Sequence, residues 1–136
     1  MDGINHLTER IIGCAIEVHR GIGPGLSEST YESALCIELE LAGLKYERQM
    51  GIPVIYKNQI IGEYRLDLLV EDAVIVEIKS VERMDPVFEA QLLTYLKITS
   101  KHIGLLINFN THLLKDGIKR LALEGTQCLR VSVAKN

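Results

Sequence analysis

Residues 65–79 read RLDLLVEDAVIVEIK. Two apolar runs, 65–70 and 74–79, flank the short polar segment 71–73, and this pattern predicts two antiparallel strands joined by a turn. A three-residue loop pairs apolar side chains on one face of the hairpin: Val70 with Val74, Leu68 with Val76, and Leu66 with Ile78. Because a slip of one residue would mix apolar and polar side chains on both faces, the sequence indicates this register.

The opposite face of the hairpin carries the charges. In the same register Asp67 lies across from Glu77, and Arg65 lies across from Lys79. Two like charges facing each other across a strand pair are unfavourable. A divalent cation held by the two carboxylates would relieve the repulsion, and so would Lys79 or Arg65 placed diagonally. The hairpin alone therefore leaves two interpretations open, the metal site of a phosphodiester hydrolase and a solvated ion network.

The composition is typical of one globular domain. The chain has 136 residues, of which 47% are hydrophobic and 24% charged, and we expect residues 1–136 to form a single domain. The net charge of −3 argues against coating of nucleic acid through bulk charge. No apolar run is long enough to cross a bilayer, and the N-terminus lacks the pattern of a signal peptide. The three cysteines form no Cys-x-x-Cys pair, which is typical of a reduced, cytoplasmic protein.

The first part of the chain predicts two helices. Apolar residues recur at helical spacing in residues 4–20 and 27–42. The glycine-rich segment 21–25 is interpreted as a tight connector, because it follows a helix rather than a strand. In the second helix Glu28 lies on the inward stripe with Tyr31, three residues later. An inward carboxylate needs a partner or a metal, although an acidic residue in a first helical turn also suits the helix dipole.

The rest of the chain alternates strands and helices. Strands are predicted at 52–56, 60–64, 103–109 and 128–133, and helices at 85–99 and 112–122. Asp85 and Pro86 would begin the helix at 85–99 as its N-cap and first residue. Gln91 and Tyr95 share one side of that helix. Strands framed by helices predict an α/β sandwich around a mixed sheet.

Five segments together resemble one nuclease superfamily. They read GLSESTY at 25–31, YRLDLLVE at 64–71, VEIK at 76–79, EAQLLTYLK at 89–97 and GLLINFN at 104–110. In these segments the chain resembles the PD-(D/E)XK nuclease superfamily, and more narrowly its bacterial family named for a Gly-x-x-Glu-x-x-Tyr motif. The resemblance implies a restriction-endonuclease-like three-layer sandwich, in which a mixed sheet with an αβββαβ core follows an extra N-terminal helix.

The resemblance also implies a catalytic site. Its six residues would be Asp67, Glu77, Lys79, Glu28, Gln91 and Tyr95, of which the last two face the others from the helix at 85–99. Asp67, Glu77 and the backbone carbonyl of Ile78 would bind Mg²⁺ or Mn²⁺, and Glu28 would complete the coordination directly or through water. Lys79 would orient the attacking water or stabilise developing charge.

Metal-dependent hydrolysis of nucleic-acid phosphodiester bonds is the function that follows, with DNA as the expected partner. A homodimer is one arrangement for a small domain acting on duplex DNA. The alternative is a non-catalytic nucleic-acid-binding or protein-interaction module on the same fold, which the acidic charge and the scarcity of aromatic side chains favour. A different metal-assisted hydrolase or a defence nuclease with a narrow substrate is a third hypothesis. The sequence does not separate DNA from RNA, or endonuclease from exonuclease cleavage.

Overall fold

The computed structural model describes residues 2–123. The elements are α1 (Asp2–Ile22), α2 (Glu28–Leu41), β1 (Tyr46–Tyr56), β2 (Gln59–Val70), β3 (Val74–Lys79), α3 (Pro86–Thr99), β4 (Ile103–Asn108), the 3₁₀ helix η1 (Leu114–Gly117) and β5 (Ile118–Ala122). The strands form one sheet in the order β1-β2-β3-β4-β5. Strands β3 and β4 are parallel, and the other neighbours are antiparallel. The mixed sheet and its helices confirm the predicted α/β fold.

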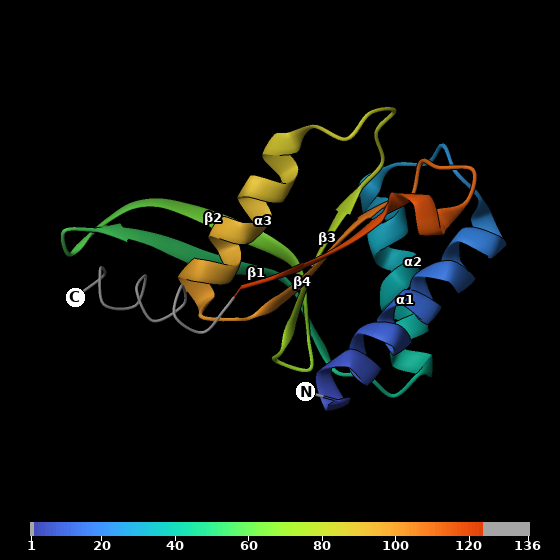
Figure 1. Ribbon diagram of the computed structural model, residues 1–136, viewed down its shortest axis with the longest axis horizontal. Coiled ribbons are helices and arrows are strands. Elements are labelled where there is room, and N and C mark those ends of the chain that lie inside the picture. Colours follow the sequence, from blue (N-terminus) through green and yellow to red (C-terminus); the bar gives the residue numbers. More distant parts are fainter. Residues whose placement is uncertain (1, 124–136) are drawn as a thin grey trace.

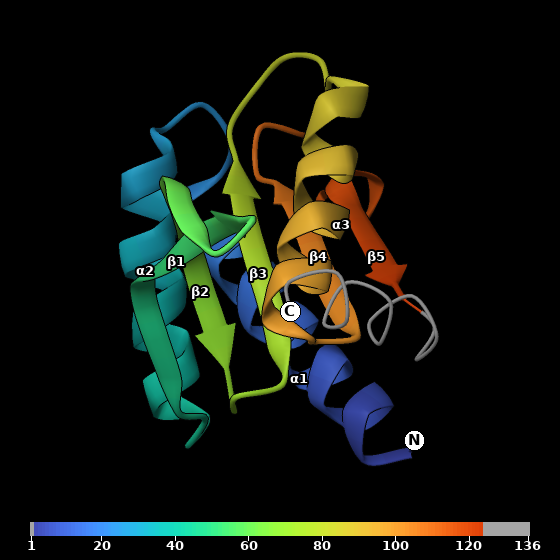
Figure 2. The same cartoon turned by 90° about the vertical axis from the view of Figure 1, so that its left-hand side faces the viewer.

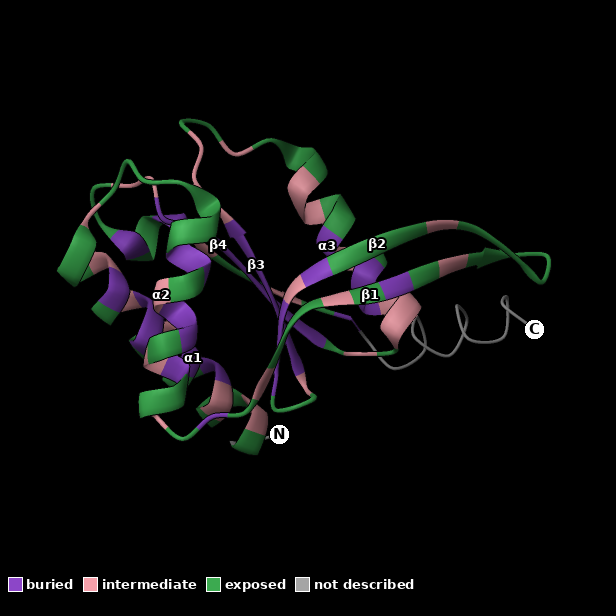
Figure 3. Cartoon of the chain, turned by 180° about the vertical axis from the view of Figure 1, so that it is seen from behind, coloured by how far each residue is buried: buried purple, intermediate pink, exposed green. Residues whose placement is uncertain are grey.

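The helices cover both faces of the sheet. Helices α1 and α2 lie on one face and α3 lies on the other (Figures 1 and 2). Two hydrophobic cores match these layers: Leu68 and Val76 pack under α1 and α2, whereas Leu69 and Ile75 pack under α3. Strands β3 and β4 are buried along nearly their whole length (Figure 3). Continuous apolar sequence is what a parallel strand pair between two helical layers requires.

The β2–β3 hairpin follows the predicted register only near its turn. Val70 pairs with the first residue of β3 and Leu68 pairs two residues further on, as predicted. The ladder ends at Leu68, and the predicted pair of Leu66 with Ile78 is wrong. Leu66 packs in the core under α3, whereas Ile78 packs in the core under α1 and α2. Beyond Leu68, side-chain hydrogen bonds replace the backbone ladder between the two strands.

Residues 112–122 contain the largest error of the sequence prediction. Instead of a helix, this segment forms the short η1 and then β5, which pairs antiparallel with β4. Strand β4 would otherwise leave a row of backbone donors and acceptors unpaired at the edge of the sheet, and pairing with β5 satisfies them. The strand predicted at 128–133 lies outside the described residues.

The other helices agree with the sequence prediction. Helices α1 and α2 correspond to the segments predicted at 4–20 and 27–42. Helix α3 begins at Pro86, and the Asp85 side chain accepts a hydrogen bond of 2.9 Å from the N–H of Val87. Strand β1 begins at Tyr46, earlier than predicted. Within residues 2–123, no helix combines the length and the apolar character needed to cross a membrane.

Candidate functional site

Asp67 and Glu77 lie side by side where β2 and β3 separate. The N–H of Asp67 donates to Glu77 Oε2 at 2.9 Å, and the N–H of Ile78 donates to Asp67 Oδ2 at 2.8 Å. Each carboxylate is therefore fixed by the backbone of the neighbouring strand. Glu77 stands between Val76 and Ile78, which belong to the core under α1 and α2, so it projects to the face that α3 covers.

Burial changes the acid–base behaviour of this pair. Glu77 is only 6% exposed. Its burial, followed by the charge of Asp67, raises its pKa to about 8. Burial also raises the pKa of Asp67, and the charge of Glu32 adds to the effect. Two carboxylates close together, one of them buried and the other half-buried, resist double ionisation, and a bound cation is the usual compensation.

Lys79 lies on the same face as Glu77, two residues further along β3. Its Nζ lies 4.5 Å from the centroid of the Phe88 ring on α3. Within residues 2–123, no ion pair within 4 Å involves Lys79. Its positive charge nevertheless lowers the pKa of both Asp67 and Glu77. The ammonium is thus held near the carboxylates by an aromatic ring, without being neutralised by direct contact.

Helix α3 brings one of its two predicted residues to the site. Tyr95 is buried, and its ring packs at 6.2 Å from that of Tyr64 on β2. Burial raises the pKa of Tyr95, and the charges of Glu77 and Asp67 raise it further. Tyr95 therefore faces the carboxylate pair. Gln91, one turn earlier, is exposed at the open side of the helix, and its side chain forms no hydrogen bond with residues 2–123.

Glu32, rather than Glu28, is the buried carboxylate of α2. Glu28 is exposed in the first turn, so its predicted inward position is wrong. Glu32, one turn later, is 6% exposed. The helix begins at Glu28, and Tyr31, Leu35 and Leu39 form the side that packs on the sheet, which leaves the first turn at the rim.

Two residues of β1 join Glu32 to the site, and the sequence analysis missed both. Arg48 Nε donates to Glu32 Oε2 at 2.6 Å, and Gln49 Nε2 donates to Glu32 Oε1 at 2.7 Å. Gln49 Nε2 also lies 3.3 Å from Asp67 Oδ1. Gln49 has a left-handed backbone (φ 54°), which is uncommon for a residue with a side chain. The sequence offered one signal for Glu32, because a polar residue four positions after Glu28 lies on the same side of the helix. No local pattern predicted the conformation of Gln49.

These residues line a common pocket of about 560 Å³. Its walls are formed by Glu28, Ser29, Glu32, Arg48, Gln49 and Asp67. Glu28 and Asp67 therefore border the same space, although Glu28 makes no hydrogen bond or ion pair with any of the described residues. The pocket opens beside the carboxylate pair and gives a ligand access to Asp67.

Arg48→Ala is expected to lower the free energy of unfolding by about 2 kcal/mol, because it leaves the Glu32 carboxylate buried with one partner fewer. The matched control is Arg20→Ala, which removes a 3.6 Å ion pair with Glu17 on the surface of α1. That change is expected to cost less than about 0.5 kcal/mol. Urea unfolding of both variants measures the difference. Equal losses would show that the Arg48–Glu32 pair behaves as an ordinary surface pair.

The donor set at the carboxylate pair suits a hard divalent cation. Within residues 2–123, no three His, Cys, Asp or Glu side chains are grouped so that they could hold a metal. Two carboxylates are nevertheless adjacent, and a backbone carbonyl is available. The N–H and C=O of one strand residue project toward the same neighbouring strand. Since the N–H of Ile78 binds Asp67, the Ile78 carbonyl also lies on that side. Oxygen donors of this kind, completed by water, match Mg²⁺.

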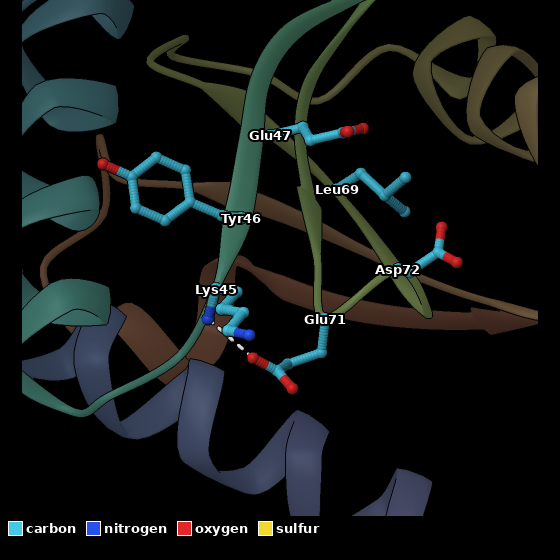
Figure 4. Close-up of a pocket in the computed structure, with 6 residues that line it drawn as sticks. All are labelled: Lys45, Tyr46, Glu47, Leu69, Glu71 and Asp72. Atoms are coloured by element: carbon cyan, nitrogen blue, oxygen red, sulfur yellow. Dashed lines mark hydrogen bonds between the residues drawn. The ribbon is translucent and has the colours of Figure 1, made fainter.

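A second pocket, of about 300 Å³, lies at the turn end of β2 and lacks this chemistry (Figure 4). Its lining residues are Lys45, Tyr46, Glu47, Leu69, Glu71 and Asp72. Glu71 Oε2 accepts a 2.6 Å hydrogen bond from the N–H of Lys45, and Asp72 Oδ1 pairs with Lys101 Nζ at 3.1 Å. The carboxylates of Glu47 and Glu71 point away from each other in Figure 4. This pocket is therefore held by structural bonds and offers no convergent donor set.

Comparison with known proteins identifies the class. The sequence model of the PD-(D/E)XK nuclease superfamily matches residues 5–121. The chain therefore belongs to the PD-(D/E)XK nuclease superfamily. A solved structure described as "Crystal structure of SSO0001" is 17% identical over 79% of this chain and 56% of that one, with a TM-score of 0.45. This chain thus matches little more than half of that protein. A search of curated proteins finds no match.

Proposed function

We propose that the protein is a metal-dependent nuclease that hydrolyses phosphodiester bonds of nucleic acid, with DNA as its substrate and Mg²⁺ or Mn²⁺ as its cofactor. The observation that carries the proposal is the pair formed by the half-buried Asp67 and the buried Glu77: the pKa of each carboxyl is raised, and Asp67 lines an open pocket. Neither carboxylate forms an ion pair within residues 2–123, and such an acidic pair is costly to retain for stability alone. Membership of a nuclease superfamily supports the same reading.

Three groups would hold the cation: Asp67, Glu77 and the Ile78 carbonyl. Glu28 stands at the rim of the same pocket, where it would contribute through water. A bound divalent cation lowers the pKa of a coordinated water and stabilises negative charge on phosphate oxygens. Binding would also favour the ionised form of Glu77, which the metal-free protein disfavours at neutral pH.

The remaining residues would orient the reacting groups and shield the carboxylates from bulk water. Lys79 is positioned by the Phe88 ring, so its ammonium would direct the attacking water or stabilise charge on the phosphate. Tyr95 would exclude bulk water from the buried side of the carboxylates. Gln91 lies exposed on α3, one turn before Tyr95. It would therefore contact the substrate phosphate rather than hydrogen-bond to a carboxylate that binds the metal. Gln49 would orient Asp67 by linking it to Glu32.

The narrower assignment to the Gly-x-x-Glu-x-x-Tyr family is part of the proposal. Gly25 has φ +96°, a conformation that favours glycine. The Tyr31 hydroxyl donates to the Gly23 carbonyl and accepts from the N–H of Leu26 at 3.1 Å, so it fixes the loop before α2. The Tyr31 ring stacks on Phe109 at 4.5 Å. The glycine and tyrosine of the motif would thus hold the loop, which leaves Glu28 as the residue free to act.

Cleavage assays test the proposal. Wild type and Asp67→Asn are incubated with labelled single-stranded, duplex and branched DNA and with RNA, in Mn²⁺ or Mg²⁺. We expect wild type to cleave at least one DNA substrate and Asp67→Asn to lose at least about 10²-fold, since a metal ligand is lost. The matched control is Asp116→Asn on η1, an exposed aspartate, which should keep full activity. Equal cleavage by Asp67→Asn and wild type would reject the mechanism.

A binding module without catalysis remains the second candidate, because Glu28 stays outside the carboxylate pair. Isothermal titration with Mn²⁺ separates the two functions. Saturable binding that Asp67→Asn removes favours the nuclease. Binding of nucleic acid without any Mn²⁺ binding favours the module.

A further inference from the structure

The hairpin of β1 and β2 extends beyond the body of the sheet. We call residues 53–63 the arm; Figure 1 shows it projecting past α3. Every residue of the arm is exposed or half-buried, in contrast to the central strands (Figure 3). Its large apolar side chains, Ile55, Tyr56, Ile60 and Ile61, are 40% to 64% exposed. Apolar surface gathered on a protrusion of this kind usually has a partner.

The arm is a regular ribbon. Ile55 pairs with Ile60, and Tyr56 pairs with Gln59. The two residues of its turn, Lys57 and Asn58, both have left-handed backbones, with φ of 48° and 67°. Two left-handed residues form the turn that best matches the twist of a β-hairpin. The protrusion is therefore built into the fold and presents its tip in a defined orientation.

The chemistry of the tip indicates what the partner is. The arm has two charged residues, Lys57 in its turn and Glu63 at its base, so the tip itself is positively charged in a chain whose net charge is −3. It stands beside two amide side chains, Asn58 and Gln59, with its Nζ 5.4 Å from the centroid of the Tyr56 ring. Asn and Gln side chains can bind adenine edges in the major groove, and apolar groups can contact thymine methyls. The positive charge of Lys57 suits the phosphates that border the major groove.

The position of the arm relative to the site fits the same partner. Strand β2 carries both Ile60 and Asp67, and seven residues of extended strand separate the two by about 23 Å. That separation is about seven base-pair steps of B-form DNA at 3.4 Å each. The major groove is wide enough to admit a two-stranded ribbon. One duplex could therefore contact the arm and the carboxylate pair together.

We propose that the arm is a duplex-DNA reader that enters the major groove about seven base pairs from the phosphate presented to Asp67 and Glu77. Lys57 binds a phosphate beside the groove, Asn58 and Gln59 contact base edges, and the isoleucines pack against thymine methyls. The proposal rests on the proposed nuclease function for its substrate. It adds the class of nucleic acid, a duplex, and the element that selects it.

The test compares an arm variant with a matched surface variant. The arm variant carries Lys57→Gln, Ile60→Ser and Ile61→Ser. The control carries Lys115→Gln, Ile37→Ser and Leu41→Ser, which remove one lysine and two exposed apolar side chains from η1 and α2. Both elements pack on the face of the sheet opposite α3. Each protein is assayed in Mn²⁺ on a labelled 30-base-pair duplex and on one of its strands alone.

The expected result is a loss of at least about tenfold in kcat/KM on the duplex for the arm variant, the size of one lost base contact. Its activity on the single strand, which has no groove, should stay within about twofold of wild type, and the control should match wild type on both. Equal losses on the two substrates, or no loss on the duplex, would overturn the proposal. So would a wild-type dimer that the arm variant dissociates in sedimentation, because the apolar tip would then bind a second copy.

A failure of the proposed nuclease function can be distinguished from a failure of the proposed role of the arm. If wild type cleaves neither substrate, fluorescence anisotropy of the labelled duplex in Ca²⁺ decides the role of the arm alone. Tenfold weaker duplex binding by the arm variant, with unchanged binding by the control, would support a reader on a non-catalytic module. Equal binding by all three proteins would overturn it.

Discussion

Glu77→Gln is expected to abolish metal-stimulated cleavage and, at the same time, to stabilise the metal-free protein above neutral pH. Glutamine keeps the oxygen that accepts the hydrogen bond from the N–H of Asp67. It removes a carboxylate whose charge the folded protein disfavours, mainly through burial and then through Asp67. Stability and activity should therefore change in opposite directions, which is typical of a residue retained for chemistry.

The sign of the pH dependence follows from the raised pKa. The folded protein holds the Glu77 proton up to about pH 8, whereas the unfolded chain releases it near 4.5. Ionisation therefore lowers the stability of wild type progressively between these two pH values, and Glu77→Gln does not share this loss. The two proteins should be equally stable near pH 4, and the variant should be more stable by about 5 kcal/mol at pH 9.

Urea unfolding in EDTA between pH 4 and pH 9 measures the effect, with Glu17→Gln on the exposed face of α1 as the control. Glu17 is solvent-exposed, so its replacement should leave the pH profile of wild type unchanged. A Glu77→Gln profile parallel to that of wild type would show that Glu77 is ionised at no cost. Retained cleavage by the same variant would remove Glu77 from the mechanism.

Gly117→Ala is expected to be the most destabilising conservative change, with a loss of about 3 kcal/mol. A Cβ at this buried residue would lie 2.2 Å from the Asn108 carbonyl oxygen and 3.0 Å from Thr111 Cγ2. The first contact is with backbone, so β4 or η1 would have to move. Asn108 ends β4 beside Lys79, and its side chain binds both the N–H and the carbonyl of Val81, so the movement would reach the end of β3 that carries Lys79.

Gly13→Ala provides the matched control. Gly13 lies on the exposed side of α1, and a Cβ there would meet nothing within 4 Å. The same substitution should therefore stabilise the protein by about 0.5–1 kcal/mol, because alanine favours helix more than glycine does. Thermal unfolding should move the two melting temperatures in opposite directions. If the Gly117→Ala protein is as stable as wild type, then the backbone around Gly117 and Asn108 can accommodate a Cβ without cost.

Prediction from sequence succeeded where one periodic pattern decides the structure. Local rules predicted three features correctly: the apolar pairs near the turn of the β2–β3 hairpin, the N-cap at Asp85 and the two N-terminal helices. These rules also placed Asp67 and Glu77 together, because both lie on the polar face of one hairpin. The catalytic roles of the six predicted residues remain predictions.

The errors in the sequence prediction arose where contacts with distant segments of the chain determine the local structure. Residues 112–122 contain a helix-like apolar spacing, but the free edge of β4 turns them into a strand. Leu66 changes sides of the sheet because the ladder to β3 ends at Leu68. Glu32 became the buried carboxylate of α2 only because Arg48 and Gln49 of β1 lie against it. Each of these outcomes needs a contact between segments that no short window contains.

Among the strands of residues 2–123, β1 lies at an edge of the sheet, and an edge strand invites pairing with other chains and aggregation. Three interruptions within seven residues limit this risk: the left-handed Gln49, Pro53, and the bulge between Val54 and Ile55. No uninterrupted run between them is longer than a few residues, so a foreign strand finds little backbone to extend. Gln49 thereby serves two purposes, since the residue that links Glu32 to Asp67 also helps to keep the chain from self-association.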